Sequence, residues 1–90
     1  MVNKRITAAT TQVHQALTVE QNTPLVKCAQ LMHDANVGSL VVTGRRNGQS
    51  VPVGLLTDRD ITIKVVAFLL DPGVITAGDI MAHFPPAQGA

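Results

Sequence analysis

The chain has almost no aromatic side chains, with 2 Phe and no Trp or Tyr in 90 residues. Proteins that bind single-stranded nucleic acid stack bases on aromatic rings, and that platform is missing here. Charge is also scarce and balanced: 7 Lys and Arg face 6 Asp and Glu, for a formal net charge of +1. The only adjacent basic pairs are Lys4-Arg5 and Arg45-Arg46. A nucleic-acid surface normally has a clustered basic face, so this class of function is not expected.

The chain contains a single cysteine, Cys28, which excludes an internal disulfide and fits a reducing compartment. No apolar run approaches the roughly 20 residues that a membrane span needs. Polar Thr and Gln follow Lys4 and Arg5, where a signal peptide would have its apolar segment. We therefore expect a cytoplasmic protein that does not bind membranes.

Reactive side chains in a catalytic or metal-binding pattern are missing as well. His14, His33 and His83 are far apart in the sequence and have no metal-ligand spacing. Cys28 falls on the apolar face of a predicted helix, which is typical of a core thiol. Nothing pairs a nucleophile with a base. We expect no enzyme activity, no metal site and no required cofactor.

Apolar residues, in contrast, are plentiful: 46% of the chain is hydrophobic and 14% is charged. A chain this short buries only roughly 60–65% of its unfolded surface, so it must leave much of this apolar surface exposed. We expect a second copy of the chain to cover part of it.

Hydrophobic spacing and turn residues predict a first strand and a first helix. Residues 16–20 are long enough for one short strand. A helix over 24–35 follows, with Thr23 as its N-cap and proline in its first turn. Asn36 or Gly38 ends this helix in the left-handed conformation.

The second half of the pattern predicts a hairpin and a second helix. Strands over 39–43 and 51–56 are separated by the polar turn region 44–50. The helix over 58–70 carries apolar residues on more than one stripe, as expected for packing on two sides. A short strand over 74–77 follows, and residues 79–81 begin a further turn.

The predicted fold is of the α/β class, α+β type, in the order β-α-β-β-α. A small three-stranded sheet is covered on one face by two helices. The expected domain organisation is an arm or short helix over 1–15, the folded motif over 16–81 and a tail over 82–90.

Two polar side chains mark the junction between the last long strand and the second helix. Thr57 and Asp60 lie three residues apart, directly after the apolar residues Val53 to Leu56. This spacing fits a capping box, in which each side chain bonds the other's backbone amide. It also fits a ligand site, because open α/β layers hold ligands at strand ends and helix N-termini favour phosphate. Both interpretations stay open from the residues alone.

The junction and the element order together resemble a CBS domain over about residues 10–81. The most specific part is Pro52-Val53-Gly54-Leu55-Leu56-Thr57-Asp58-Arg59-Asp60-Ile61. Supporting stretches are Leu17-Thr18-Val19, Ala29-Gln30-Leu31-Met32 and Asn36-Val37-Gly38-Ser39-Leu40-Val41-Val42. Thr76-Ala77-Gly78-Asp79-Ile80-Met81 looks like the entry into a second motif. CBS motifs usually come in pairs that form a Bateman module, and this chain ends where the second would begin. It is expected to be half of a longer protein or to rely on a second chain.

The resemblance implies a regulatory module that binds an adenosine derivative: AMP, ADP, ATP, S-adenosylmethionine or an NAD-type nucleotide. It assigns ribose or phosphate to Thr57 and the ribose hydroxyls to Asp60. Arg59 lies between them and would neutralise a phosphate as a ligand residue, but a solvated first-turn position is the preferred interpretation. The adenine would lie near the backbone of Thr18, Val19, Val37 and Ser39. We expect a homodimer joined through helical apolar faces, with an unknown regulated protein as a further partner. The alternative is a truncated half that serves structure or dimerisation and holds no tight ligand.

Overall fold

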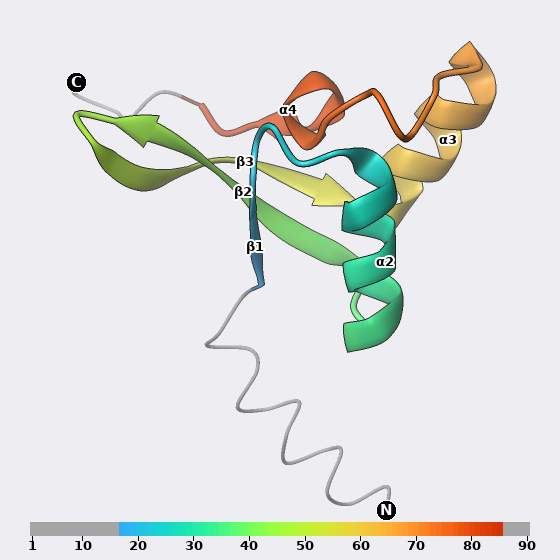
Figure 1. The fold of residues 1–90 in the computed structure, drawn as a ribbon, viewed down its shortest axis with the longest axis horizontal. Coiled ribbons are helices and arrows are strands. Elements are labelled where there is room, and N and C mark those ends of the chain that lie inside the picture. The colour runs from blue at the N-terminus through green and yellow to red at the C-terminus, as the bar shows by residue number, and fades with distance from the viewer. Residues whose placement is uncertain (1–16, 86–90) are drawn as a thin grey trace, which may run out of the picture.

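The computed structural model describes residues 17–85 (Figure 1). The predicted arm over 1–15 lies outside the described residues, as does the end of the tail. The elements are β1 (Thr18–Glu20), α2 (Leu25–Ala35), β2 (Ser39–Arg46), β3 (Gln49–Thr57), α3 (Asp58–Phe68), α4 (Ala77–Ile80) and β4 (Ala82–His83). The predicted order β-α-β-β-α is confirmed, and α4 and β4 extend it.

The sheet has four strands in the order β1-β2-β3-β4. The predicted count of three was wrong, because β4 pairs antiparallel with β3 at Gly54 and Leu55. β1 runs parallel to β2, with α2 as the crossover, and β2 and β3 form an antiparallel hairpin. Figure 1 shows α2 beside the sheet and α3 continuing from the end of β3. The N-terminal end of β2 and the C-terminal end of β3 therefore meet at one end of the sheet.

The hairpin is longer than the sequence indicated, and its turn is only two residues long. Arg45 pairs with Ser50 and Arg46 pairs with Gln49, so most of the predicted loop 44–50 is strand. The turn residues Asn47 and Gly48 have φ of 54° and 78°. Positive φ at both central residues is the requirement of a type I′ turn, whose twist matches the flanking strands.

The helix ends follow the predicted residues with small shifts. Pro24 is the N-cap of α2, one residue after the predicted Thr23, and no side chain caps this end. Thr23 instead accepts a backbone hydrogen bond from Ala77 at 2.8 Å. Asn36 ends α2 with φ of 57°, as predicted. α3 ends at Phe68, two residues earlier than predicted.

Residues 74–77 do not form the predicted strand. Thr76 makes one isolated bridge with Pro24 and then caps α4. Its side chain and that of Asp79 form a capping box, with the Thr76 amide 2.9 Å from Asp79 Oδ2. A Thr-x-x-Asp sequence starts a helix more readily than it continues a strand.

The core lies between α2, the sheet and α4. Its largest fully buried side chains are Leu25, Cys28, Leu40, Val42 and Leu56. Burial raises the pKa of the Cys28 thiol, partly opposed by a backbone hydrogen bond, so this thiol is held in its neutral form. α3 contributes no fully buried residue, although Ile61 and Val65 pack against the core. Much of the apolar surface of α3 is left for another contact.

Candidate functional site

The start of β2 and the end of β3 bring several predicted site residues to one edge of the sheet. Ser39 and Thr57 are direct partners across the two strands. The Asp58 amide donates to the Gly38 carbonyl at 3.0 Å, which fixes the loop before β2 against the start of α3. Thr18 pairs with Val41 on the neighbouring strand, two residues along from Ser39. The predicted residues therefore come from three chain segments to the same end of the sheet.

Thr57 and Asp60 form a complete capping box at the start of α3. The Asp60 amide donates to Thr57 Oγ1 at 3.1 Å, and the Thr57 amide donates to Asp60 Oδ2 at 3.3 Å. This structural interpretation of the pair is confirmed. Among residues 17–85, Asp60 Oδ1 accepts no hydrogen bond, and both side chains are half-buried rather than sealed. The cap and a ligand role are therefore compatible, because one carboxylate oxygen is free for a second partner.

The charges at this helix start come from three consecutive residues. Asp58 and Asp60 lie in the first turn, and the exposed Arg59 lies between them. A Cβ placed on Gly38 would lie 3.2 Å from Asp58 Oδ2, so the Asp58 carboxylate sits against the loop before β2. Two carboxylates oppose the attraction of a helix N-terminus for phosphate. The start of α3 thus carries two carboxylates that accept hydrogen bonds and one exposed positive charge.

The sequence alone indicates no role for Asp58. Its approach to Gly38 depends on how the loop before β2 packs on α3, and nothing local in the sequence marks that contact.

Val19 and Val37 lie between the core and the edge of the sheet. Both side chains are half-buried and pack against the core cluster. The Val19 carbonyl already accepts a hydrogen bond from Thr43 Oγ1 at 3.3 Å, and the Val37 amide donates to Met32 at 3.0 Å. Thr18, in contrast, is exposed. The predicted adenine region is therefore a backbone edge with Thr18 and Ser39 as its accessible side chains.

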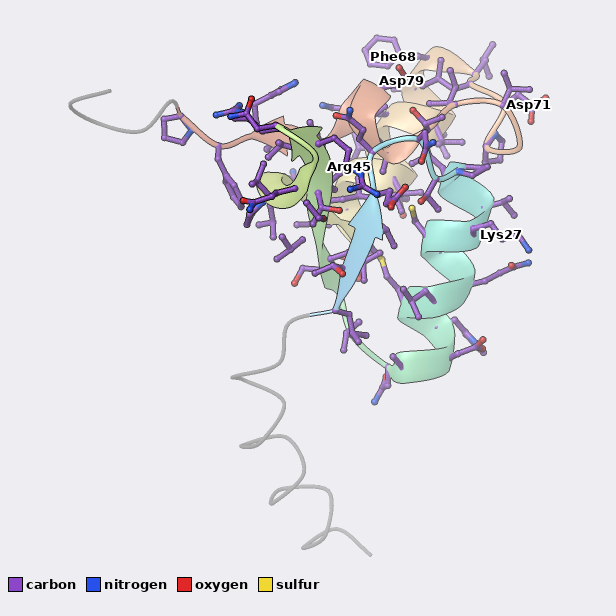
Figure 2. All side chains as sticks on the ribbon, turned by 60° about the vertical axis from the view of Figure 1, so that its left-hand side comes forward. Lys27, Arg45, Phe68, Asp71 and Asp79 are labelled. Carbon is purple, nitrogen blue, oxygen red and sulfur yellow. The ribbon has the colours of Figure 1, made fainter. Side chains whose placement is uncertain are left out.

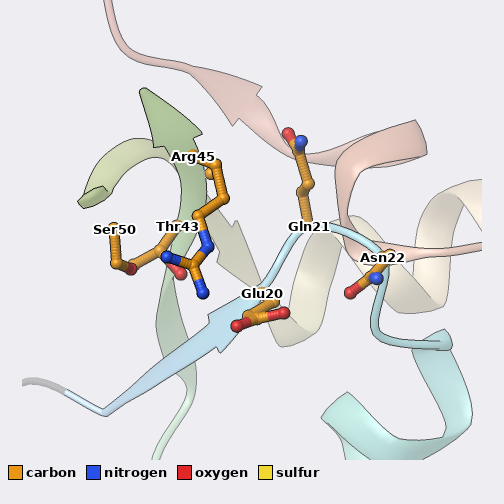
Figure 3. A pocket seen from close by; sticks show the side chains of 7 residues that line it. Glu20, Gln21, Asn22, Thr43, Arg45 and Ser50 are labelled. Atoms are coloured by element: carbon orange, nitrogen blue, oxygen red, sulfur yellow. The ribbon is translucent and has the colours of Figure 1, made fainter. Parts of the chain in front are cut away.

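A pocket of about 120 Å³ lies elsewhere, at the far end of β1, and none of the predicted site residues lines it (Figure 3). Pockets for ligands of drug size hold roughly 300–1,000 Å³. The predicted nucleotide residues lie at the opposite end of the sheet and line no part of this pocket.

We expect Thr57→Ala to lower the free energy of unfolding by about 1 kcal/mol, because the Asp60 amide loses its acceptor. Thr57→Ser keeps the hydroxyl and is expected to cost less than half as much. Urea denaturation of the two variants measures both effects. Equal losses would show that the hydroxyl does not stabilise the helix start.

A model of the CBS domain family matches residues 9–67. The chain belongs to the CBS domain family. The predicted resemblance and fold class are confirmed. CBS-domain proteins are typically regulatory or structural modules rather than catalysts.

Known relatives agree with this assignment. Hypoxic response protein 1 of Mycobacterium tuberculosis is 39% identical over 62 residues, which cover 69% of this chain and 41% of that protein. A crystal structure of Hypoxic Response Protein I with two coordinated zinc ions has a TM-score of 0.64 and 35% identity, covering 77% of this chain and 55% of that one. A hexameric CBS-CP12 protein from bloom-forming cyanobacteria has a TM-score of 0.65 and 29% identity, covering 76% and 36%. The chain spans less than half the length of the curated relative, and the solved relatives include an oligomer.

The zinc ions belong to that relative's structure. Within residues 17–85 of this CBS domain, no group of three His, Cys, Asp or Glu side chains is placed to hold a metal ion. In the same part of the chain, no helix is long and apolar enough to cross a membrane.

Proposed function

We propose that this CBS domain is a regulatory module that binds an adenosine nucleotide where β2 begins and β3 ends. The observation that supports it is the Thr57–Asp60 pair, which lies beside Ser39 and keeps one free carboxylate oxygen. Binding would alter the packing of a dimer, and a partner protein would respond to that change. The module performs no chemistry of its own.

The chemistry of the edge fits a ribose better than a bare phosphate. Asp60 Oδ1 can accept hydrogen bonds from the vicinal ribose hydroxyls, and charged acceptors bond strongly. The Thr57 hydroxyl can donate to a neighbouring ribose or phosphate oxygen. Arg59 is exposed and carries the one positive charge in the first turn of α3. Adenosine derivatives supply a diol, a flat base and, in most cases, a phosphate.

A second function is favoured by a separate observation. The capping box is complete without a ligand, and the 120 Å³ pocket found among residues 17–85 is lined by none of the predicted residues. The domain would then act in dimerisation or structure and hold no tight ligand. Native mass spectrometry of gently purified protein separates the two: a retained adenosine compound supports the regulatory function, and ligand-free protein that stays ligand-free with added nucleotide supports the structural one.

The surface of α3 supports self-association. Three apolar side chains of α3 and that of its C-cap residue, Leu69, are largely exposed. Ile63 is exposed by 50%, Val66 by 68%, Phe68 by 67% and Leu69 by 90%. Nearby, Val74 is 69% exposed. An apolar patch of this kind normally marks an interface. We propose a homodimer in which the helical faces of two chains meet, by the self-complementary contact that twofold symmetry imposes.

We expect a dimer at micromolar concentration in sedimentation velocity and a shift to monomer in the double variant Phe68→Ser with Leu69→Ser. The exposed positions tolerate serine in the monomer, while the interface loses its apolar contacts. Phe84→Ser is the matched control, because Phe84 is 42% exposed but lies after β4. A monomeric wild type, or equal effects of both variants, would contradict this interface.

A further inference from the structure

A small polar pocket lies at the opposite end of β1 and β2 from the proposed nucleotide site (Figure 3). Its volume is about 120 Å³. Its lining residues are Glu20, Gln21, Asn22, Thr43, Gly44, Arg45 and Ser50. None of them belongs to the proposed nucleotide site, so its occupant is a separate question.

The strand register gathers four polar side chains on one face of the sheet. Glu20 of β1 pairs with Thr43 of β2, and Arg45 of β2 pairs with Ser50 of β3. Thr43 and Arg45 are two residues apart on one strand and so point to the same face. The alternate position between them, Gly44, is buried on the core side. These four side chains therefore lie on the face of the sheet that points away from the core, and Gly44 and Gln21 complete the lining from the other side.

Glu20 and Arg45 give the pocket one negative and one positive side. Figure 3 shows the Arg45 guanidinium directed toward the Glu20 carboxylate. Among residues 17–85 the two groups form no ion pair with each other, and no other charged side chain lines the pocket. Arg45 Nη1 donates to the Gly48 carbonyl at 2.9 Å, which orients the guanidinium and leaves its other N–H groups for a ligand. Both charges are thus available to one small molecule.

The other charged side chains labelled in Figure 2 do not line the pocket. Figure 2 shows Arg45 near the centre of the molecule, with Lys27 on α2 to one side and Asp71 and Asp79 near α3 and α4. None of these three labelled charges is among the lining residues. Glu20 and Arg45 are therefore the two charged residues of the pocket lining.

We propose that this pocket binds a small α-amino acid as its zwitterion. The Arg45 guanidinium takes the carboxylate, the group that its planar fork matches with two parallel hydrogen bonds. The Glu20 carboxylate accepts from the ammonium group. The hydroxyls of Thr43 and Ser50 and two side-chain amides complete the polar lining. Its volume of about 120 Å³ suits the backbone and side chain of a small amino acid such as glycine, alanine or serine.

An occupant would connect the hairpin with the segment before α2. The Gln21 amide donates to the Thr43 carbonyl at 2.9 Å, and the Gln21 carbonyl accepts from Gly78 at 2.8 Å. This segment therefore contacts both β2 and α4. Amino-acid binding at Glu20 and Arg45 would stabilise the contact between the hairpin and α4.

The test is a titration of ¹⁵N-labelled protein with glycine, L-alanine and L-serine, followed by amide chemical shifts. We expect saturable shifts at Thr43, Arg45 and Ser50. Acetate and methylammonium each carry only one of the two charges and are expected to bind at least about tenfold more weakly.

Matched variants complete the test. Glu20→Gln and Arg45→Gln are each expected to weaken glycine binding at least about tenfold. Arg46→Gln, the next residue along the strand, and Asp34→Asn on α2 are expected to leave it unchanged. All four side chains are exposed, so the fold is retained. The proposal is overturned if none of the three amino acids gives saturable shifts at millimolar concentration. It is also overturned if acetate binds as tightly as glycine, or if Arg46→Gln weakens binding as much as Arg45→Gln.

Discussion

Gly54→Ala is expected to lower the free energy of unfolding by about 2 kcal/mol, within the range for overpacking a well-packed site. A Cβ at Gly54 would lie 2.6 Å from Met81 Sδ and 2.7 Å from the Ala82 carbonyl oxygen. Met81 is only 7% exposed and cannot swing into solvent without leaving the core. The carbonyl belongs to the β4 backbone, so relief of the contact requires β4 to move away from β3. Urea denaturation measures the loss, and amide hydrogen exchange in β4 is expected to become faster.

Gly73→Ala is the matched control for Gly54. Its added Cβ would meet only Asp71 Oδ1, at 3.3 Å, on an exposed side chain that can turn further into solvent. We expect this change to alter the free energy of unfolding by less than about 0.5 kcal/mol. Equal effects of the two alanines would mean that β4 is not held closely against Gly54, and that the fourth strand contributes little to the fold.

Asp60→Asn is expected to weaken binding of an adenosine nucleotide by roughly 10- to 100-fold, the equivalent of about 1.5–3 kcal/mol for a hydrogen bond to a charged group. The variant keeps the shape of the side chain and an oxygen for the Thr57 amide, but it loses the negative charge that would face the ribose hydroxyls. Fluorescence competition with a labelled nucleotide measures the loss. Thermal unfolding must accompany it, because the same residue stabilises the start of α3.

Asp79→Asn is the matched control, because it changes a capping box outside the proposed nucleotide site. Asp79 occupies the same position in the capping box of α4, with hydrogen bonds to Thr76 of 2.9 and 3.1 Å. Both variants are expected to show a similar, small loss of stability, and only Asp60→Asn is expected to lose nucleotide affinity. If Asp60→Asn binds the nucleotide as tightly as the wild type does, Thr57 and Asp60 have only a structural role as a helix cap.

Much of the fold can be predicted from short-range patterns in the sequence. The Thr57–Asp60 capping box and the left-handed Asn36 were predicted because each depends on a few neighbouring residues. The hairpin end was missed because Arg45 and Arg46 project into solvent on both faces, so no apolar alternation marks them as strand. The Asn47-Gly48 pair is a signal that would have placed the turn.

Tertiary contacts account for the rest. Ala82–His83 has no strand pattern of its own and pairs with β3 because Met81 is buried and Gly54 permits close approach. The same holds for the candidate site, where Thr57 and Asp60 were found from spacing but the contact of Asp58 with Gly38 was not. The pocket of Glu20 and Arg45 joins residues 25 positions apart in the chain. Only the parallel register of β1 and β2 brings them together.

We propose above that this CBS domain binds an adenosine nucleotide at the edge formed by β2, β3 and α3. Isothermal titration of wild-type protein with AMP, ADP, ATP, S-adenosylmethionine and NADH measures this binding, with GTP as the control for the base. We expect saturable heat with at least one adenosine compound and none with GTP at the same concentrations. Absence of heat with all five, in protein shown by sedimentation to be folded and dimeric, would contradict it.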